Sequence, residues 1–263
     1  SQLVIVIFLF FVITFHLLLY ISVWGQRFEL RSTDYFFRLF YWRNEPKAPS
    51  EIAIVAIDDS GYQLLNIPFD KAWPRGLHAE LIRKLKALGA KKVVFDIIFL
   101  GEGPSPDADK DLSQAIGSMP TVIGADTGFT KHGQGASHYS LERLLEPYSD
   151  FAISAESVGL TKMPLDDGVV RRFLLPRSNL TKNFPQLYQA AVGVNSEQKG
   201  LPSDRDLIWY YGPPGEGIIS YPYHTVILDS DRIPPERFKD KIVFVGLYLR
   251  TALGPAQKDS FET

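Results

Sequence analysis

Four residues near two apolar stretches in the first half of the chain have the chemistry to bind a ligand. Asp58 follows the first stretch, Asp96 lies within the second, and Trp73 and Arg75 lie between the two. An arginine side chain can hold an anionic group through paired hydrogen bonds, and a tryptophan ring supplies an apolar or stacking face. We therefore predict that Asp58, Trp73, Arg75 and Asp96 bind a ligand.

The same residues have two other interpretations. In the first, Arg75 forms an ion pair with Asp58 or Asp96 and only fixes its loop, because charged groups near buried strand ends are usually paired. In the second, Asp58, Asp59 and Asp96 bind Mg²⁺ as part of a metal-dependent hydrolase. The chain contains no Gly-x-Ser-x-Gly, Walker or His-Glu-x-x-His motif, so we predict neither catalytic residues nor a metal site.

The elements that would position these residues form a strand–helix–strand pattern. Residues 52–58 and 93–99 are apolar runs typical of a parallel pair of buried strands. The helix between them follows Pro74 and ends before Gly89, and its apolar positions recur on one face at Leu77, Leu81, Ile82, Leu85 and Leu88. Parallel strands end at the same edge of a sheet, where open α/β sheets hold their ligands, so the four residues should lie near one edge.

The rest of the chain continues the α/β pattern. Asp167 and Gly168 predict a hairpin turn. We expect a helix capped by Asp109 and a second helix over 184–193. Further strands are predicted over residues 121–125, 151–154, 169–175, 207–211, 220–228 and 241–246. The predicted fold is α/β, with a mixed, largely parallel sheet and flanking helices, preceded by one transmembrane helix.

The N-terminal residues predict a membrane anchor. Residues 3–23 carry no charge, and at about 1.5 Å per residue such a helix spans a hydrocarbon core of roughly 30 Å. A secretory signal peptide would have a charged region before a shorter apolar run and a cleavage site of small residues after it. We expect a transmembrane helix over 1–25, a juxtamembrane helix and linker over 26–50, and one domain over 51–263.

The juxtamembrane segment is rich in aromatic residues at helical spacing. Phe28, Phe36 and Trp42 either pack on the domain of their own chain or form the interface of a homo-oligomer. A chain with a single membrane helix would form such an interface most simply in a dimer. We therefore predict a lipid membrane and a second copy of the chain, in a dimer or a higher oligomer, as partners.

Composition and charge exclude several classes of protein. The net charge of −2 and the lack of a basic cluster argue against nucleic-acid binding. The chain has no cysteine, which excludes disulfides and thiolate metal sites. His132 and His138, and the acidic cluster at 107–111, lack the arrangement of a known metal site, and no cofactor is predicted.

The chain resembles the type-two CHASE family of bacterial extracytoplasmic sensory domains. The resemblance rests on motifs spread over nearly everything after the membrane helix: residues 28–31, 54–60, 73–75, 95–99, 167–172, 241–246 and 259–263. It implies a non-catalytic receptor domain in the inner or plasma membrane. Such a domain passes an unknown small-molecule or protein stimulus through membrane helices to a cytoplasmic cyclase or kinase. The alternative is a self-assembling structural or protein-interaction module of the cell surface.

Overall fold

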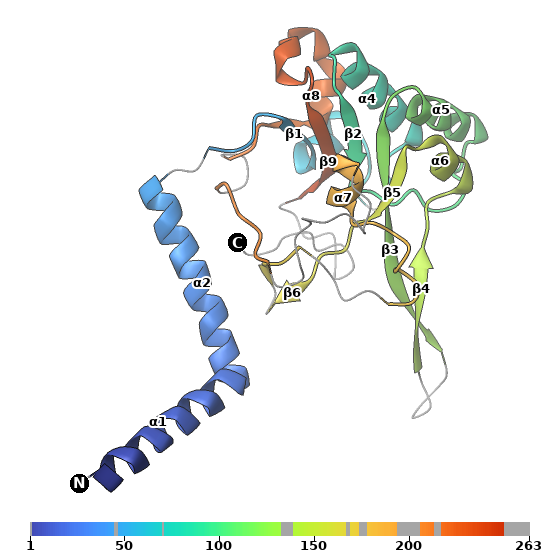
Figure 1. The fold of residues 1–263 in the computed structure, drawn as a ribbon. Helices are drawn as coiled ribbons and strands as arrows, with labels where there is room; N and C mark the ends of the chain where they lie inside the picture. Colours follow the sequence, from blue (N-terminus) through green and yellow to red (C-terminus); the bar gives the residue numbers. More distant parts are fainter. Residues whose placement is uncertain are drawn as a thin grey trace.

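A largely parallel sheet forms the centre of the molecule (Figure 1). The computed structural model describes residues 2–44, 47–69, 71–132, 139–166, 169–173, 178–193, 206–212 and 217–249. In the sheet the strand order is β4-β3-β2-β9-β1-β8, and β5 also pairs with β3. The strands are β1 (Ile52–Asp58), β2 (Lys92–Phe95), β3 (Thr121–His132), β4 (Tyr139–Leu145), β5 (Ser157–Leu160), β8 (Ser220–Pro222) and β9 (Ile242–Tyr248). Strand β4 is antiparallel to β3 and the other described pairings of this sheet are parallel, which confirms the predicted fold class.

Strand β9 lies between β1 and β2, although it comes from the far end of the described chain. Ile242 of β9 is in register with Ile52 on one side and with Lys92 on the other. The expected strand pair is therefore parallel, but the expectation that its two strands are neighbours was wrong. Local apolar patterns identify buried strands, whereas the order of the strands depends on pairing between distant segments.

In the described part of the chain, five helices cover the first face of the sheet. The predicted helix is confirmed as α4 (Arg75–Ala87), and its Leu81, Ile82 and Leu85 side chains have no exposed surface. Burying one such side chain contributes about 1.5–3 kcal/mol. The other helices on this face are α3 (Asp59–Leu64), α5 (Pro106–Gly117), α6 (Ser149–Ser154) and α8 (Tyr223–Leu228).

The second face carries a single short helix among the described residues, α7 (Leu187–Val192). Gly193 ends this helix with a φ of 72°, which glycine adopts at little cost. Ala190 and Ala191 of α7 pack on Val94 and Val122 of the sheet. Helix α7 thus covers the β2 and β3 side of this face, and a cavity lies over β1 and β9.

Several local predictions differ from the structure. Residues 151–154 belong to helix α6 rather than to a strand, and residues 220–228 divide into β8 and α8. The segment 207–211 makes only an isolated bridge, between Leu207 and Arg172. Short runs with mixed apolar residues fit either a strand or a helix, and tertiary packing decides between them. Two 3₁₀ turns, Ser230–Arg232 and Pro235–Arg237, precede β9.

The predicted hairpin is present as a small separate sheet. It pairs β6 (Leu165–Asp166) with β7 (Val169–Val170) in antiparallel register. The turn residues 167 and 168 lie outside the described residues, as does His138.

Helices α1 (Gln2–Ile21) and α2 (Val23–Asn44) form one bent rod beside the domain (Figure 1). Residues 3–20 of α1 have the length and composition to cross a membrane, and none of this stretch is buried in the protein. At the bend, the Ser22 hydroxyl donates a hydrogen bond to the Leu19 carbonyl at 2.7 Å and accepts one from the Gly25 amide at 3.0 Å. A Cβ atom at Gly25 would lie only 1.8 Å from the Leu19 carbonyl oxygen, so this bend requires a glycine.

Candidate functional site

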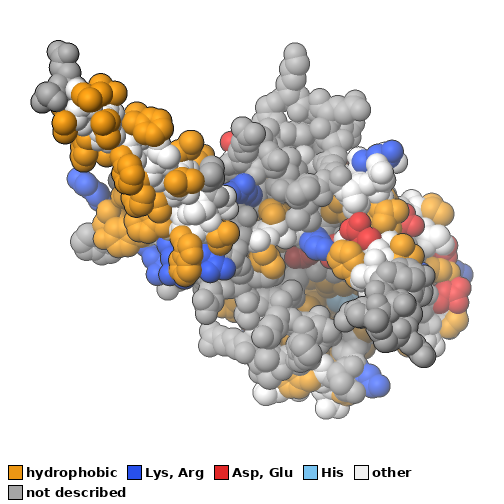
Figure 2. All heavy atoms as spheres, turned by 90° about the horizontal axis from the view of Figure 1, so that it is seen from below, with side chains coloured by type: hydrophobic (Ala, Val, Ile, Leu, Met, Phe, Trp, Pro, Cys, Tyr) orange, Lys and Arg blue, Asp and Glu red, His pale blue; other side chains and the backbone are white. Residues whose placement is uncertain are grey.

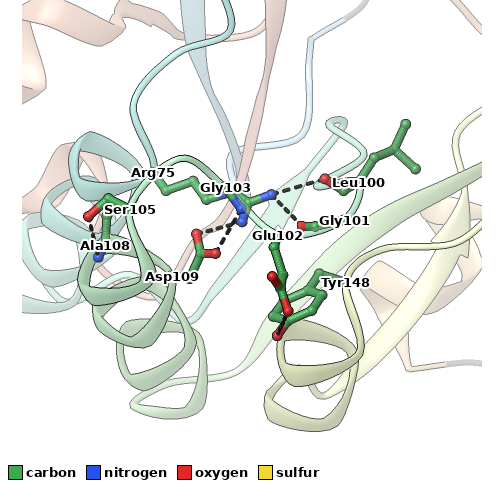
Figure 3. A network of polar contacts seen from close by, with 9 residues as sticks. All are labelled: Arg75, Leu100, Gly101, Glu102, Gly103, Ser105, Ala108, Asp109 and Tyr148. Atoms are coloured by element: carbon green, nitrogen blue, oxygen red, sulfur yellow. Dashed lines mark hydrogen bonds and ion pairs between the residues drawn. The ribbon is translucent and has the colours of Figure 1, made fainter.

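Arg75, at the start of α4, holds the loop that precedes α5 (Figure 3). Its guanidinium donates hydrogen bonds to the Leu100 carbonyl at 3.0 Å and the Gly101 carbonyl at 2.6 Å. It also forms an ion pair with Asp109 of α5, whose second carboxylate oxygen accepts a hydrogen bond from the Gly103 amide at 2.8 Å. The Arg75 guanidinium lies 4.9 Å from the centre of the Phe151 ring. The hydrogen-bond donors and the charge of Arg75 are therefore engaged by other groups of the same chain.

This network corrects two sequence-based expectations. Arg75 does form an ion pair, but with Asp109 rather than with Asp58 or Asp96. Helix α5 is capped by Ser105, and Asp109 lies in its first turn with only a small exposed fraction. Burial alone would raise the pKa of Asp109, but the hydrogen bonds from Arg75 and Gly103 and the charge of Arg75 together lower it.

Asp58 and Trp73 lie close together on the first face of the sheet. Asp58 ends β1 and caps α3, where its carboxylate accepts hydrogen bonds from the Gly61 amide and the Ser60 hydroxyl, both at 2.8 Å. Trp73 is 8% exposed and its ring meets Tyr223 edge-on, with 4.7 Å between the ring centres. These contacts make Asp58 a helix cap and Trp73 part of the core.

Asp96 follows β2 and faces the opposite side of the sheet, where it lines a cavity of about 450 Å³. The structure therefore does not bring the four predicted residues together, although Asp58 and Asp96 both lie at the carboxyl ends of parallel strands. Whether Asp58, Trp73, Arg75 and Asp96 bind a ligand stays a prediction, and only Asp96 lines this cavity.

The floor of the cavity is formed by three neighbouring strands. Ala56 of β1 is in register with Gly246 of β9. On the other side of β9, the amide of Asp96, which follows β2, donates a hydrogen bond to the Val245 carbonyl at 2.8 Å. The walls come from the segments around the sheet, and they include Thr161, Met163, Phe173, Tyr188, Ile208 and Tyr248. The cavity therefore has an apolar floor with a carboxylate at one end.

A second set of contacts joins the domain to α2. The Arg171 guanidinium donates two hydrogen bonds to the Asp34 carboxylate, at 2.8 and 2.7 Å. The Arg171 hydrogen bond lowers the pKa of Asp34 against the opposing effect of burial. The Trp209 ring packs edge-on against Phe37 and Phe40 of α2, with ring centres 5.4 and 5.0 Å apart. Helix α2, which follows the candidate membrane-spanning helix α1, is thus attached to the domain by a paired charge and an aromatic cluster.

The segment 206–212 lies between the sheet cavity and α2. Ile208 lines both the sheet cavity and a smaller cavity of about 250 Å³ between α2 and the domain. Its amide donates a hydrogen bond to the Arg171 carbonyl at 2.8 Å, and its neighbour Trp209 contacts α2. Asp34, Phe37 and Trp209 were not predicted, since contacts between distant segments leave no local pattern. The only signals were the consecutive arginines at 171 and 172 and the aromatic residues of α2.

The predicted interface residues lie on the outer side of α2. Phe28 and Phe36 are 75% and 65% exposed, while the side chain of Trp42 lies outside the described part of the structure. Hydrophobic side chains cover much of the rod formed by α1 and α2, with Lys and Arg side chains among them (Figure 2). The described residues contain no group of three or more His, Asp or Glu side chains placed to hold a metal ion.

Comparison with known proteins identifies the family of the chain. No curated protein and no solved structure matches it. The family model of the CHASE2 domain matches residues 5–263, which is almost the whole chain. The chain therefore belongs to the CHASE2 domain family, whose members are extracellular sensory domains of signalling proteins.

Proposed function

We propose that this chain is the extracytoplasmic sensor of a bacterial inner-membrane or plasma-membrane signalling protein, and that it passes its state through α2 and α1 to a cytoplasmic cyclase or kinase. In this proposal the chain detects a stimulus and carries out no reaction itself. The observation that carries the proposal is the attachment of α2 to the domain by the Arg171–Asp34 pair and the Trp209 cluster.

Both contacts are suited to transmit a movement. The two parallel hydrogen bonds of the Arg171–Asp34 pair fix orientation as well as distance, and the Arg171 side chain is 7% exposed. The aromatic rings add a packed contact within the next two turns of the helix, because Phe37 and Phe40 follow Asp34 closely in α2. If segment 206–212 is displaced, α2 should therefore move with it, because closely packed elements do not slide freely past each other.

The segment also contacts the cavity over the sheet. A change in the contents of this cavity acts on Ile208, and the adjacent Trp209 transfers the movement to Phe37 and Phe40. Transmission of this kind requires that segment 206–212 has two arrangements with different affinities for the stimulus.

A second copy of the chain is the proposed partner along the outer side of α2. Phe28 and Tyr35 are seven residues apart and exposed, with the sequence position of Trp42 seven residues further, so they share one side of the helix. Asp34 and Phe37 face the domain on the other side, so the domain does not occupy this stripe. Two copies anchored in one membrane place their α2 helices parallel, as such pairing requires.

The attachment of α2 is tested by a distance measurement in the membrane-embedded chain. Because the chain has no native cysteine, the substitutions Glu29→Cys and Lys110→Cys place spin labels at these two positions and nowhere else. Both positions are exposed, on α2 and α5. We expect a narrow distance distribution for the chain in lipid nanodiscs. The double substitution Asp34→Ala and Trp209→Ala should broaden it, whereas Arg83→Ala, which removes an exposed ion pair with Asp111, should leave it narrow. A broad distribution in the unsubstituted chain would refute rigid coupling and with it the proposed path.

A further inference from the structure

His224, the second residue of α8, lies beside a carboxylate at the end of β1. Its Nδ1 atom is 3.7 Å from Oδ1 of Asp58, which is too long for a hydrogen bond but close enough for an ion pair. This nitrogen is buried and has no hydrogen-bond partner among the described residues. The side chain of His224 is 14% exposed, so protons from the solvent can reach the ring. A proton on Nδ1 would give this nitrogen the partner that it lacks.

The acceptor atom of Asp58 can exchange one of its donors. Its Oδ1 atom accepts hydrogen bonds from the Ser60 hydroxyl and from the Gly61 amide, both at 2.8 Å. The amide is fixed by helix α3, whereas the hydroxyl is free to rotate toward another acceptor. A hydrogen bond from a charged imidazole ring is about twice as strong as one from a neutral hydroxyl. A protonated His224 can therefore displace Ser60 and keep Asp58 as the cap of α3.

The other charged or titratable groups around α8 leave Asp58 as the partner of His224. Helix α8 contacts α3, α4, β1, β8 and the turn 230–232. Apart from Asp58, the groups on these elements nearest to α8 in the packing are Asp59 and Tyr62 of α3, His78, Glu80 and Lys84 of α4, Tyr221 of β8, and Asp231 and Arg232 of the turn. In the described part of the chain, only Asp58 lies within ion-pair distance of His224. Burial lowers the pKa of His78 to about 3, so His78 stays neutral in mild acid.

A displacement at the start of α8 can reach the segment that contacts α2. Strand β8 directly precedes α8 and pairs with β1, and its Ser220 lines the cavity over the second face of the sheet. Gly217, three residues before β8 begins, packs on segment 206–212. A Cβ atom at Gly217 would lie only 2.5 Å from the Tyr211 carbonyl oxygen. The two backbones are therefore in close contact, and β8 and the segment should move together.

We propose that the stimulus is a proton, which charges His224 so that its ring binds Asp58 in place of the Ser60 hydroxyl and draws the start of α8 toward β1. The proton comes from acidified solvent, and histidine is the side chain whose charge ordinarily changes between about pH 5 and 8. The pairing itself stands on the geometry around Asp58. Its effect on α2 rests on the proposed function, because it acts through segment 206–212 and Trp209.

The pairing is tested by NMR of the full chain in nanodiscs with ¹⁵N-labelled histidine. The chain has five histidines, and the signals that disappear in His224→Gln belong to His224. We expect both ring nitrogens of His224 to carry a proton at pH 5.5 and only one of them at pH 8. Asp58→Asn should make the Nδ1 proton exchange with water about tenfold faster, because the charged acceptor is lost. Asparagine is as good a helix cap as aspartate, so α3 should be preserved.

Two controls separate this pairing from general effects of charge. Asp229→Asn removes a carboxylate at the other end of α8, which pairs with Arg232 at 3.5 Å, and should leave the exchange rate unchanged. Ser60→Ala removes the competing hydroxyl and should keep the Nδ1 proton protected. The proposal is overturned if His224 stays neutral at pH 5.5, or if its Nδ1 proton exchanges equally fast in Asp58→Asn and in the unsubstituted chain.

The effect on α2 is measured separately, with the spin labels at positions 29 and 110. We expect the distance distribution to shift between pH 8 and pH 5.5, and His224→Gln to abolish this shift. A shift that persists in His224→Gln would overturn the assignment of the stimulus to this residue. If His224 pairs with Asp58 as expected but the distance stays the same, the pairing stands and the proposed path to α2 is contradicted.

Discussion

At the scale of single residues, the charged and polar groups near the sheet edge divide into structural and accessible ones. Arg75 and Asp109 satisfy each other in a nearly buried pair, and Asp58 caps α3. Of the four predicted ligand residues, only Asp96 is among the described residues that line the cavity over the second face of the sheet. A residue type suited to binding is thus also suited to capping or pairing, and its surroundings decide its role.

Replacing Arg75 should strongly destabilise the domain. The Arg75→Ala variant leaves the carboxylate of Asp109 in a site where the paired side chains are only 12% and 10% exposed. Breaking such a pair costs about 3–5 kcal/mol of unfolding free energy. The matched control is Arg83→Ala, whose pair with Asp111 is 49% and 40% exposed and should contribute less than about 1 kcal/mol. Urea unfolding of both variants measures the difference, and equal losses would show that the Arg75 network contributes little.

The buried His78 should make the domain less stable in mild acid. Burial, and to a lesser extent the charge of Arg75, lowers the pKa of His78 from 6.5 to about 3, and its Nδ1 lies 3.1 Å from the Tyr223 hydroxyl. Below pH 6.5 the unfolded chain binds a proton at this residue that the folded chain does not bind. The stability contributed by neutral His78 is therefore complete above this pH and decreases as the pH falls toward 3, by at most about 1.4 kcal/mol per pH unit.

The pH dependence is measured by urea unfolding between pH 7 and pH 5. His78→Gln should have a shallower dependence than the unsubstituted chain. Tyr223→Phe removes the hydroxyl but keeps the histidine, so its dependence should be unchanged. A His78→Gln variant with the original slope would show that other groups cause the acid sensitivity.

At the scale of elements, the important relation is between α1, α2 and the domain. The bend between α1 and α2 sets the angle between the candidate membrane-spanning helix and α2 (Figure 1). The contacts of Asp34 and Trp209 then fix α2 on the domain. Because both attachments act on the same helix, a movement of the domain is expected to change the orientation of α1.

Replacing Gly25 should open this bend. In Gly25→Ala the new methyl group would overlap the Leu19 carbonyl, so the backbone must move apart and the rod should straighten. Spin labels at Leu3→Cys and Arg43→Cys should then be farther apart, approaching the roughly 60 Å of a straight helix of this length. Gly76→Ala is the matched control, because a Cβ atom at Gly76 meets no described atom within 4 Å. An unchanged distance in Gly25→Ala would mean that the bend does not depend on the glycine.

At the scale of the whole molecule, the proposed signalling path runs from the second face of the sheet to the membrane. The domain covers one side of α2, the proposed second copy covers the other, and the cavity over the second face of the sheet lies behind segment 206–212. A bound molecule, the segment and the helix pair would therefore lie in series. Each contact in the series can be removed separately.

Removing the outer stripe of α2 should reduce the oligomeric state. Phe28→Ala combined with Tyr35→Ala deletes two exposed aromatic side chains without changing the face that contacts the domain. We expect the protein mass in detergent, measured by light scattering after size exclusion, to fall from that of a dimer to that of a single chain. Phe129→Ala, which removes a similarly exposed ring on β3, should not change the mass. A single-chain mass for the unsubstituted protein would exclude this mode of pairing.

The sequence by itself determined the α/β class, the membrane-spanning candidate, helix α4 and the buried strands β1, β2 and β9. These features follow from local periodicity, chain length and the absence of charge, which are properties of neighbouring residues. Tertiary structure alone decided that β9 separates β1 from β2, that Arg75 pairs with Asp109, and that Trp209 packs on α2. Each of these contacts joins segments that are far apart in the chain, and many partners of suitable charge or shape exist for each residue. Only the folded packing selects one of them, and it separated Asp96 from the three residues with which it had been grouped.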